Sequence, residues 1–522
     1  MRKQVLFGAA LLALGTAVVS SCSKDEVVID NTPGVETPVA EGEQEIVLQV
    51  ANTGDELTSR AGRPLYSAEA KQNIDNVFIM IVSKSGDTKG KVVKANLIEN
   101  WMQVSADYST NGHGKQYTWK LSGKDVLAAG NYFVYAIGYS NNSSYQYNTS
   151  GTIADYVEDM ITSTPNFAKF TAKLANIKAE EFFAGEIAAI TVGDGGEFEL
   201  TANQTANVLT LHRQVTGVTG YYINVPTTMV ENRGDILAAL EDGTNAAANK
   251  TIYNNAIKNY KLRLVSSNCS NKIVAAAFNS SFTTTGEDID YVVNGHAVDT
   301  KITADAEFKG EDEKTRYTVY EITLGDWFPN GDVNGDGILG EEDYNQDADN
   351  WRKPTSMGNE AVGFQPGSVF GAEFLIPFLK TANTKTLELQ LVGANITVSS
   401  DSGDKLTAGA ETILRTWNIN LASDDDQLGK DPQNGRKVYT VDWDATPEDV
   451  WDTYQPKQVA DEAYAENRES YSLVRNHLYS VGEKATDEWN PDKDEPQDLS
   501  TGQNLILRVN DNWELIHKME VE

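Results

Sequence analysis

The sequence contains few cysteines, which can form disulfides, and few histidines, which often serve in catalysis. Among 522 residues there are only two cysteines, Cys22 and Cys269, and five histidines. If Cys22 carries a lipid, as its surroundings predict, no internal disulfide can form and stability has to come from packing. Basic residues are also scarce, 43 against 76 acidic ones, and the formal net charge of −33 disfavours binding to nucleic acid or to an anionic membrane surface.

Recognisable catalytic motifs are absent as well. The histidines are scattered at His113, His212, His296, His477 and His517. None belongs to a His-Glu-x-x-His motif, and there is no Gly-x-Ser-x-Gly turn or phosphate-binding glycine loop. We therefore predict that the chain is not an enzyme. A surface glycosidase stays open as a third alternative, because only the fold could bring two suitable carboxylates together among 76 acidic residues.

The amino terminus indicates export. Arg2 and Lys3 precede the apolar run 5–19, which is shorter than the ~20 residues that cross a bilayer as a helix and is typical of a cleaved signal peptide, residues 1–21. The run ends at Val19-Ser20-Ser21-Cys22, which resembles a lipobox, so Cys22 is predicted to carry diacylglycerol. The following Ser23-Lys24-Asp25-Glu26 resembles a tag that sends lipoproteins to the cell surface. After residue 22 no transmembrane helix is predicted.

The rest of the chain predicts a mainly β protein. Residues 23–44 are acidic, polar and proline-bearing, as in a tether. Ile46, Leu48 and Val50 then alternate as in a strand. Further strands are predicted at 77–82, 132–139, 208–215, 221–225, 262–265, 272–278, 317–324, 387–392 and 504–509, and helices at 155–161, 234–240 and 446–453. Short strands with little helix favour β-sandwiches, with two domains at 61–285 and 286–522.

Several segments resemble the fimbrillin family, the shaft subunits of type V pili in Bacteroidales, and most of all the minor-fimbria shaft type. They occur in order along most of the chain, and their order is more specific than any single one. Besides the lipobox, the segments are Leu57–Gly62, Gly130–Gly138, Phe182–Gly185, Leu209–Val215 and Val474–Val481.

This resemblance implies two transthyretin-like β-sandwich domains with a few short helices and export as an outer-membrane lipoprotein. It also implies removal of an amino-terminal strand by an arginine-specific surface protease and polymerisation by strand exchange. The expected partners are other copies of the chain, anchor and tip fimbrial subunits, and host or bacterial surface receptors. The implied roles are adhesion and biofilm formation from a cell-surface fimbrium.

The residues after the first strand would permit this cleavage. Arg60 lies in a loop-like segment and precedes Ala61, whereas Arg63 precedes Pro64, whose ring restricts the bond before it. We predict that the Arg60–Ala61 bond is cut, which would remove residues 22–60 together with the strand that contains Ile46.

The carboxyl terminus carries a candidate donor strand. Five residues alternate with charged or apolar neighbours and would share one face, as in a strand. They are Trp513, Leu515, His517, Met519 and Val521. The segment could fill the groove of another subunit, or it could be the last strand of its own domain.

A calcium loop is predicted independently of the family. Counted from Asp332, oxygen-bearing side chains fall at positions 1, 3, 5 and 12, with glycine at position 6, as in EF-hand loops. The predicted ligands are Asp332, Asn334, Asp336, the carbonyl of Ile338, and Asp343. An Asp- and Asn-rich turn without a metal is the alternative. A non-polymerising, calcium-stiffened surface lipoprotein that acts as an adhesin or binds glycan is the second functional hypothesis.

Overall fold

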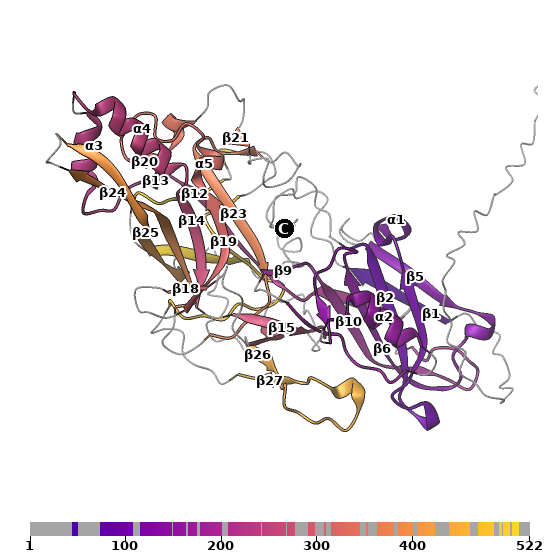
Figure 1. The fold of residues 1–522 in the computed structure, drawn as a ribbon. Coiled ribbons are helices and arrows are strands. Elements are labelled where there is room, and N and C mark those ends of the chain that lie inside the picture. The colour runs from indigo at the N-terminus through magenta and orange to yellow at the C-terminus, as the bar shows by residue number, and fades with distance from the viewer. Residues whose placement is uncertain are drawn as a thin grey trace, which may run out of the picture.

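The structure, a computed structural model, describes most residues from 44 to 510. The longest gaps between 44 and 510 are 51–73, 277–290, 353–362 and 423–437. The described residues are mainly β, which confirms the predicted fold class, and they form two β-sandwich domains that are seen side by side in Figure 1. None of the helices in this part of the chain combines the length and apolar character that crossing a bilayer requires.

The first domain is built on an eight-stranded sheet with the order β3-β2-β6-β10-β11-β1-β5-β4. Its strands are β1 (Gln44–Val50), β2 (Asn76–Ser83), β3 (Val92–Ile98), β4 (Ala106–Asp107), β5 (Lys115–Leu121), β6 (Gly130–Tyr139), β10 (Phe183–Val192) and β11 (Asn207–Arg213). Alternate residues of β2 belong to two different cores. Val77, Ile79 and Ile81 pack with β1, β5 and β11, so the sheet curls around one core. Phe78 and Met80 belong to a second core.

The second core lies on the other face of the curled sheet. It is covered by helix α2 (Ile153–Ile161) and by a small sheet in which β8 (Thr171–Lys173) pairs with β7 (Gln146–Tyr147) and β15 (Ser270–Val274). Thr152 and Asp155 form a capping box at the start of α2, which explains why this short helix forms. The short elements α1 (Trp101–Val104), η1 (Gly86–Thr88) and η2 (Gly123–Asp125) connect strands.

The second domain contains an eleven-stranded sheet with the order β18-β19-β14-β24-β25-β30-β28-β12-β23-β9, with β29 paired to β12. The strands are β9 (Lys178–Ala179), β12 (Thr216–Ile223), β14 (Lys261–Ser266), β18 (Glu307–Lys309), β19 (Thr315–Thr323), β23 (Ser368–Leu375), β24 (Leu387–Ser399), β25 (Lys405–Leu421), β28 (Leu478–Val481), β29 (Gln497–Asp498) and β30 (Asn504–Asn510). β12 and β23 face β19 across the core, since Gly371 lies against the ring of Tyr320 and Gly220 lies against its hydroxyl group. A side chain at either glycine would clash with Tyr320.

Helices and smaller sheets complete the second domain. The helices α3 (Arg233–Glu241) and α4 (Ala246–Ile257) lie against one end of β24 and β25 (Figure 1). The other elements are α5 (Leu324–Trp327), η4 (Glu341–Asp343), η7 (Val450–Asp452), β13 (Val225–Pro226), β16 (Tyr291–Val293), β17 (Gly295–Ala297), β20 (Ile338–Leu339), β21 (Trp351–Arg352), β22 (Gly363–Phe364), β26 (Val438–Val441) and β27 (Pro456–Gln458).

The sequence predicted the strands more accurately than it predicted the helices or the boundary between the domains. The predicted strands that fall among the described residues coincide with or overlap strands of the structure, but α4 was not predicted, and only η7 forms within the predicted helix 446–453. The predicted boundary at residue 285 lies outside the described residues. The chain passes from the first sheet to the second at Gln214–Val215, so β12 and β14 share a sheet with strands that the prediction assigned to the second domain.

Two of the family-like segments, Leu209–Val215 and Val474–Val481, meet at a buried junction between the two domains. The Gln214 side chain accepts hydrogen bonds from Arg475 Nη1 at 3.2 Å and from Asn294 Nδ2 at 3.0 Å. Beside it, Arg213 forms an ion pair with Glu181 at 2.8 Å and lies 3.4 Å from Asn476 Oδ1. The side chains of Arg213 and Glu181 are each only 2% exposed, so both charges depend on this pairing.

The buried ion pair gives a stability prediction. Glu181→Ala leaves the Arg213 charge without its carboxylate partner and should lower the free energy of unfolding by about 3–5 kcal/mol. The matched control is Glu495→Ala, which removes the exposed partner of Arg508 and should cost less than about 1 kcal/mol. Urea unfolding of both variants measures the difference, and equal losses would contradict a structural role for the junction.

Candidate functional site

Strand β1 is enclosed by neighbours on both edges although it comes first among the described residues. It pairs in parallel with β11, from Ile46 opposite Asn207 to Val50 opposite Leu211. On its other edge it pairs antiparallel with β5, from Gln44 opposite Leu121 to Val50 opposite Lys115. β11 and β5 are therefore joined within the sheet only through β1.

One face of β1 completes the inner core of the first domain. Ile46, Leu48 and Val50 are fully buried, and they pack in the cluster that contains Trp119 and Leu209. The intervening residues are half-buried, as the alternating sequence predicts. Each of the three apolar side chains contributes about 1.5–3 kcal/mol when buried. Removal of β1 would therefore open an apolar groove in the centre of the sheet.

A buried amide fixes the start of the strand. The side chain of Gln44 is fully buried. Its Nε2 donates to the carbonyl oxygens of Leu127 at 3.0 Å and Gly196 at 2.7 Å, and its Oε1 accepts from the Leu127 N–H at 2.8 Å. Without Gln44, these backbone groups would lose their partner. The sequence analysis did not single out Gln44, because a lone glutamine beside an acidic tether carries no signal of burial.

Both edges of the vacated position would present unpaired backbone groups. All seven residues of β1 pair with β5 on one side, and residues 46–50 pair with β11 on the other. Buried N–H and C=O groups without partners are costly, so the groove would favour another extended segment with alternating apolar side chains. A resident strand and an incoming strand would compete for the same place.

Several predicted site residues lie outside the described residues. They are the lipidation site Cys22, the cleavage site Arg60 and Ala61, and the donor residues Trp513, Leu515, His517, Met519 and Val521. Of the segment predicted to be removed, the structure describes residues 44–50. At the other end it describes β30, which pairs with β25 and β28 and ends at Asn510.

The predicted calcium loop folds around the carboxylate of Asp332. The Oδ1 atom accepts a hydrogen bond from Gly335 N at 2.6 Å, and Oδ2 accepts from Gly337 N at 2.8 Å. Helix α4 holds this residue from outside the loop, since Tyr253 OH donates to Oδ2 at 2.9 Å and Asn254 Oδ1 accepts from Asp332 N at 3.0 Å. Gly337 has a φ of +82°, a left-handed conformation that favours glycine.

The last predicted ligand closes the loop. Asp343 is 3% exposed and accepts from Val333 N at 2.6 Å and Gly340 N at 3.0 Å. Desolvation by burial raises the pKa of Asp332 and the pKa of Asp343, and the charge of Asp332 adds to the rise at Asp343. One loop therefore contains two carboxylates whose charged forms are disfavoured by burial.

The remaining predicted ligands are more exposed. Asn334 Oδ1 accepts from Asp336 N at 3.0 Å, and Asp336 Oδ1 accepts from Ile338 N at 2.8 Å. Next to β13, Thr227 N donates to the carbonyl oxygen of Gly337 at 3.1 Å. The residue types suit a hard cation, which prefers oxygen ligands. In the part of the chain that the structure describes, however, no three His, Cys, Asp or Glu side chains converge in a way that would hold a metal ion.

Comparisons with known proteins give only distant likenesses. No family model and no curated protein matches the sequence. Similar solved structures include the fimbrial anchor protein Mfa2 from Porphyromonas gingivalis, with 11% identity, coverage of 83% of this chain and 100% of that chain, and a TM-score of 0.26. The tip fimbrial protein Mfa3 from Porphyromonas gingivalis, with C-terminal truncation, has 8% identity, coverage of 87% and 97%, and a TM-score of 0.29.

A third similar structure is a fimbrial assembly protein from Parabacteroides distasonis, with 11% identity, coverage of 70% of this chain and 98% of that chain, and a TM-score of 0.26. These three similar structures are described as fimbrial proteins.

The enclosed position of β1 gives a prediction about its two faces. Leu48→Ala removes a fully buried side chain and should lower the free energy of unfolding by about 2–5 kcal/mol. Val47→Ala is the matched control on the half-buried face and should cost clearly less. Denaturant unfolding of the uncut protein measures both. Equal effects would show that the inner face of β1 is not packed.

Proposed function

We propose that this protein is a structural subunit of a cell-surface fimbrium. It is exported as a lipoprotein anchored through Cys22 to the outer membrane, cut after Arg60, and polymerised by donor-strand exchange to support adhesion and biofilm formation. The observation that carries the proposal is the enclosure of β1 between β11 and β5 with Ile46, Leu48 and Val50 fully buried. A strand in that position can be exchanged for another but cannot simply be lost.

Proteolysis supplies the switch in this mechanism. While β1 belongs to the same chain, its return to the groove is intramolecular, and an incoming segment also bears the entropy of association. A cut at Arg60–Ala61 separates β1 from the domain that it completes. From then on β1 can dissociate irreversibly, and a segment from another copy can take its place.

The candidate donor strand provides groups of the required kind. Leu515, Met519 and Val521 alternate in the same period as Ile46, Leu48 and Val50. Backbone bonding on both edges would not depend on side-chain identity, whereas the buried position of Gln44 would demand a new partner or a rearrangement. The exchange is therefore expected to be slow without removal of the resident strand.

The proteolytic switch is tested by substitution at the predicted bond. Arg60→Ala should give a folded monomer that a trypsin-like protease cannot convert, because β1 stays covalently attached. Arg63→Ala is the matched control, since Arg63 precedes Pro64, and it should still form ladders after cleavage, as the wild type does. Gel analysis under non-dissociating conditions gives the readout. Long ladders from Arg60→Ala alone would overturn the switch.

The same assay identifies the donor segment. Deletion of residues 513–522 should leave the Arg60–Ala61 bond cleavable but prevent growth, because the vacated groove finds no donor. Mixed with the Arg60→Ala variant before protease is added, the truncated form should give capped heterodimers and nothing longer. Ladders formed by the truncated protein alone would assign the donor to another segment.

We also propose that the loop 332–343 binds calcium with a structural role. The proposed ligands are Asp332, Asn334, Asp336, the Ile338 carbonyl and Asp343. Support comes from the two buried carboxylates within one loop and from Gly337, whose conformation permits the sharp turn. Tyr253 and Asn254 of α4 form hydrogen bonds with Asp332, so calcium bound in the loop would also stabilise the helical end of the second domain.

Removal of divalent cations tests this assignment. A chelator should lower the melting temperature of the second domain, because a ligand that binds only the folded state stabilises it. Asp336→Ala should abolish that shift, whereas the control Asp87→Ala, an exposed residue of the first domain, should retain it. Elemental analysis of the chelated sample verifies that the metal is gone. A metal-free wild type with an unchanged melting curve would contradict the proposal.

A further inference from the structure

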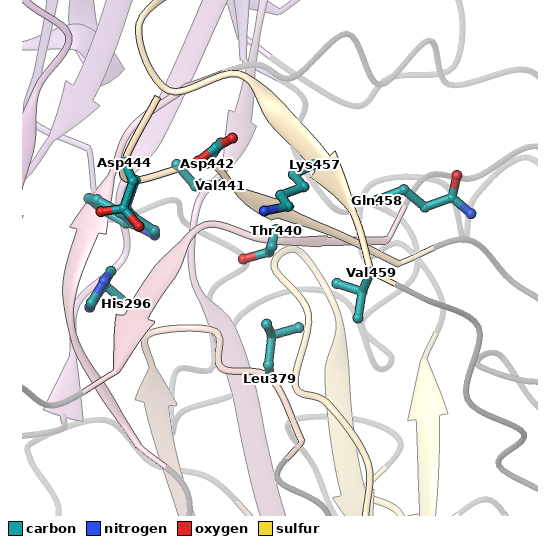
Figure 2. Close-up of a pocket in the computed structure, with 10 residues that line it drawn as sticks. His296, Leu379, Thr440, Val441, Asp442, Asp444, Lys457, Gln458 and Val459 are labelled. Carbon is teal, nitrogen blue, oxygen red and sulfur yellow. The ribbon is translucent and has the colours of Figure 1, made fainter. Parts of the chain in front are cut away.

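A pocket in the second domain lies apart from the β1 groove and from the Asp332 loop. It is formed at the small sheet of β16, β26 and β27 beside β17, and it has a volume of about 350 Å³. Figure 2 shows Asp444 and His296 on one side of the pocket and Lys457 and Val459 on the other. The volume lies at the lower end of the ~300–1,000 Å³ range of small-molecule pockets.

The wall of the pocket is built around Trp443. Lys272 Nζ lies 4.8 Å from the ring centroid, His296 makes an edge contact at 4.9 Å, and Tyr454 packs at 5.3 Å. The indole Nε1–H is buried and has no acceptor among the described residues, although a buried indole N–H usually donates a hydrogen bond. The wall therefore offers a ligand the carbon surface of its aromatic rings, since the indole N–H itself is buried.

The charged side chains at the pocket include acidic and basic groups in equal number, so their charges balance. Asp442 and Asp444 bring two carboxylates, while Lys457 in the lining and Lys272 over the ring bring two ammonium groups. A phosphate or carboxylate ligand would meet the two acidic side chains, and an amine would meet the two lysines. A neutral ligand that both donates and accepts hydrogen bonds fits this mixture better than either ion.

The loop between β26 and β27 is held in place beyond the pocket. After Asp444 it reaches the first domain, where Trp451 lies under Lys84 at 5.2 Å and Lys89 at 5.6 Å, and Lys89 pairs with Asp449 at 2.8 Å. Trp443 is therefore carried by a hairpin that is anchored at its tip. A wall fixed before binding reduces the entropy that a ligand would otherwise have to overcome.

We propose that this pocket binds a neutral hexose or N-acetylhexosamine residue at the end of a glycan. The C–H face of the sugar ring would contact the aromatic wall of Trp443, because aromatic faces attract weakly positive C–H groups. The sugar hydroxyls would bond to Asp442, Asp444 and Lys457. This assignment does not rest on polymerisation, because all of these residues belong to one subunit.

The test uses the full chain with the Arg60→Ala substitution, an uncut form that presents the pocket whether or not fimbriae assemble. The probe is a microarray of oligosaccharides that end in galactose, N-acetylgalactosamine, glucose, N-acetylglucosamine or mannose, with sialylated and sulfated glycans for comparison. Binding to at least one neutral terminus is expected, with competition by the free monosaccharide in a titration calorimeter.

Substitutions in the pocket test whether the glycan binds there. Trp443→Ala and, separately, Asp444→Asn should each weaken it by about tenfold or more, the effect of losing one good aromatic contact or hydrogen bond. Asp444 is exposed, so its substitution should leave the melting temperature unchanged even if Trp443→Ala unfolds the hairpin. Val230→Ala, which is 59% exposed and lies beside α3, is the control and should bind normally.

Three results would overturn the proposal. They are binding to no neutral terminus, a preference for charged glycans, and equal binding by the Asp444→Asn variant, the control and the parent chain. Failure of the fimbrial proposal would appear instead in the polymerisation assay and would leave this result unchanged.

Discussion

The pairing of β1 on both of its edges is the interaction on which the first domain depends. The strand joins β11 to β5 and places Ile46, Leu48 and Val50 in the inner core. In the chain, β1 is followed by the segment 51–73, which leads to β2. In the proposed mechanism, one cut in that segment would separate β1 from the domain that it completes, and another strand would replace it.

Strand β11, which pairs with β1, leads directly into the junction between the two domains. β11 ends at Arg213, which pairs with Glu181 and lies beside Asn476 of the second domain, and the next residue, Gln214, bonds to Arg475 and Asn294. These buried polar groups bond to one another between the two sheets. Among the described residues the two domains are thus joined by buried polar contacts, and Cys269 is a free thiol.

The two candidate ligand sites of the second domain are separated within the fold. The Asp332 loop lies at the helical end, where α4 supplies Tyr253 and Asn254, whereas the Trp443 pocket lies on the β26–β27 hairpin near the first domain (Figure 1). The two proposals give these sites different roles. The loop would stabilise the domain, and the pocket would recognise a surface sugar.

Local patterns in the sequence determined the strands. Alternation placed Ile46, Leu48 and Val50 on one buried face, and the spacing from Asp332 to Asp343 predicted a calcium loop, because both features depend on neighbours in the chain. The structure describes the fold of that loop, and calcium binding stays a prediction. The partners of those residues were decided only by the tertiary structure. Gln44 is buried because Leu127 and Gly196 lie beside it, and Tyr253 reaches Asp332 because α4 packs there. The sheet change at Gln214–Val215 depends on long-range pairing of β12 with β23 and β28, which no local periodicity encodes.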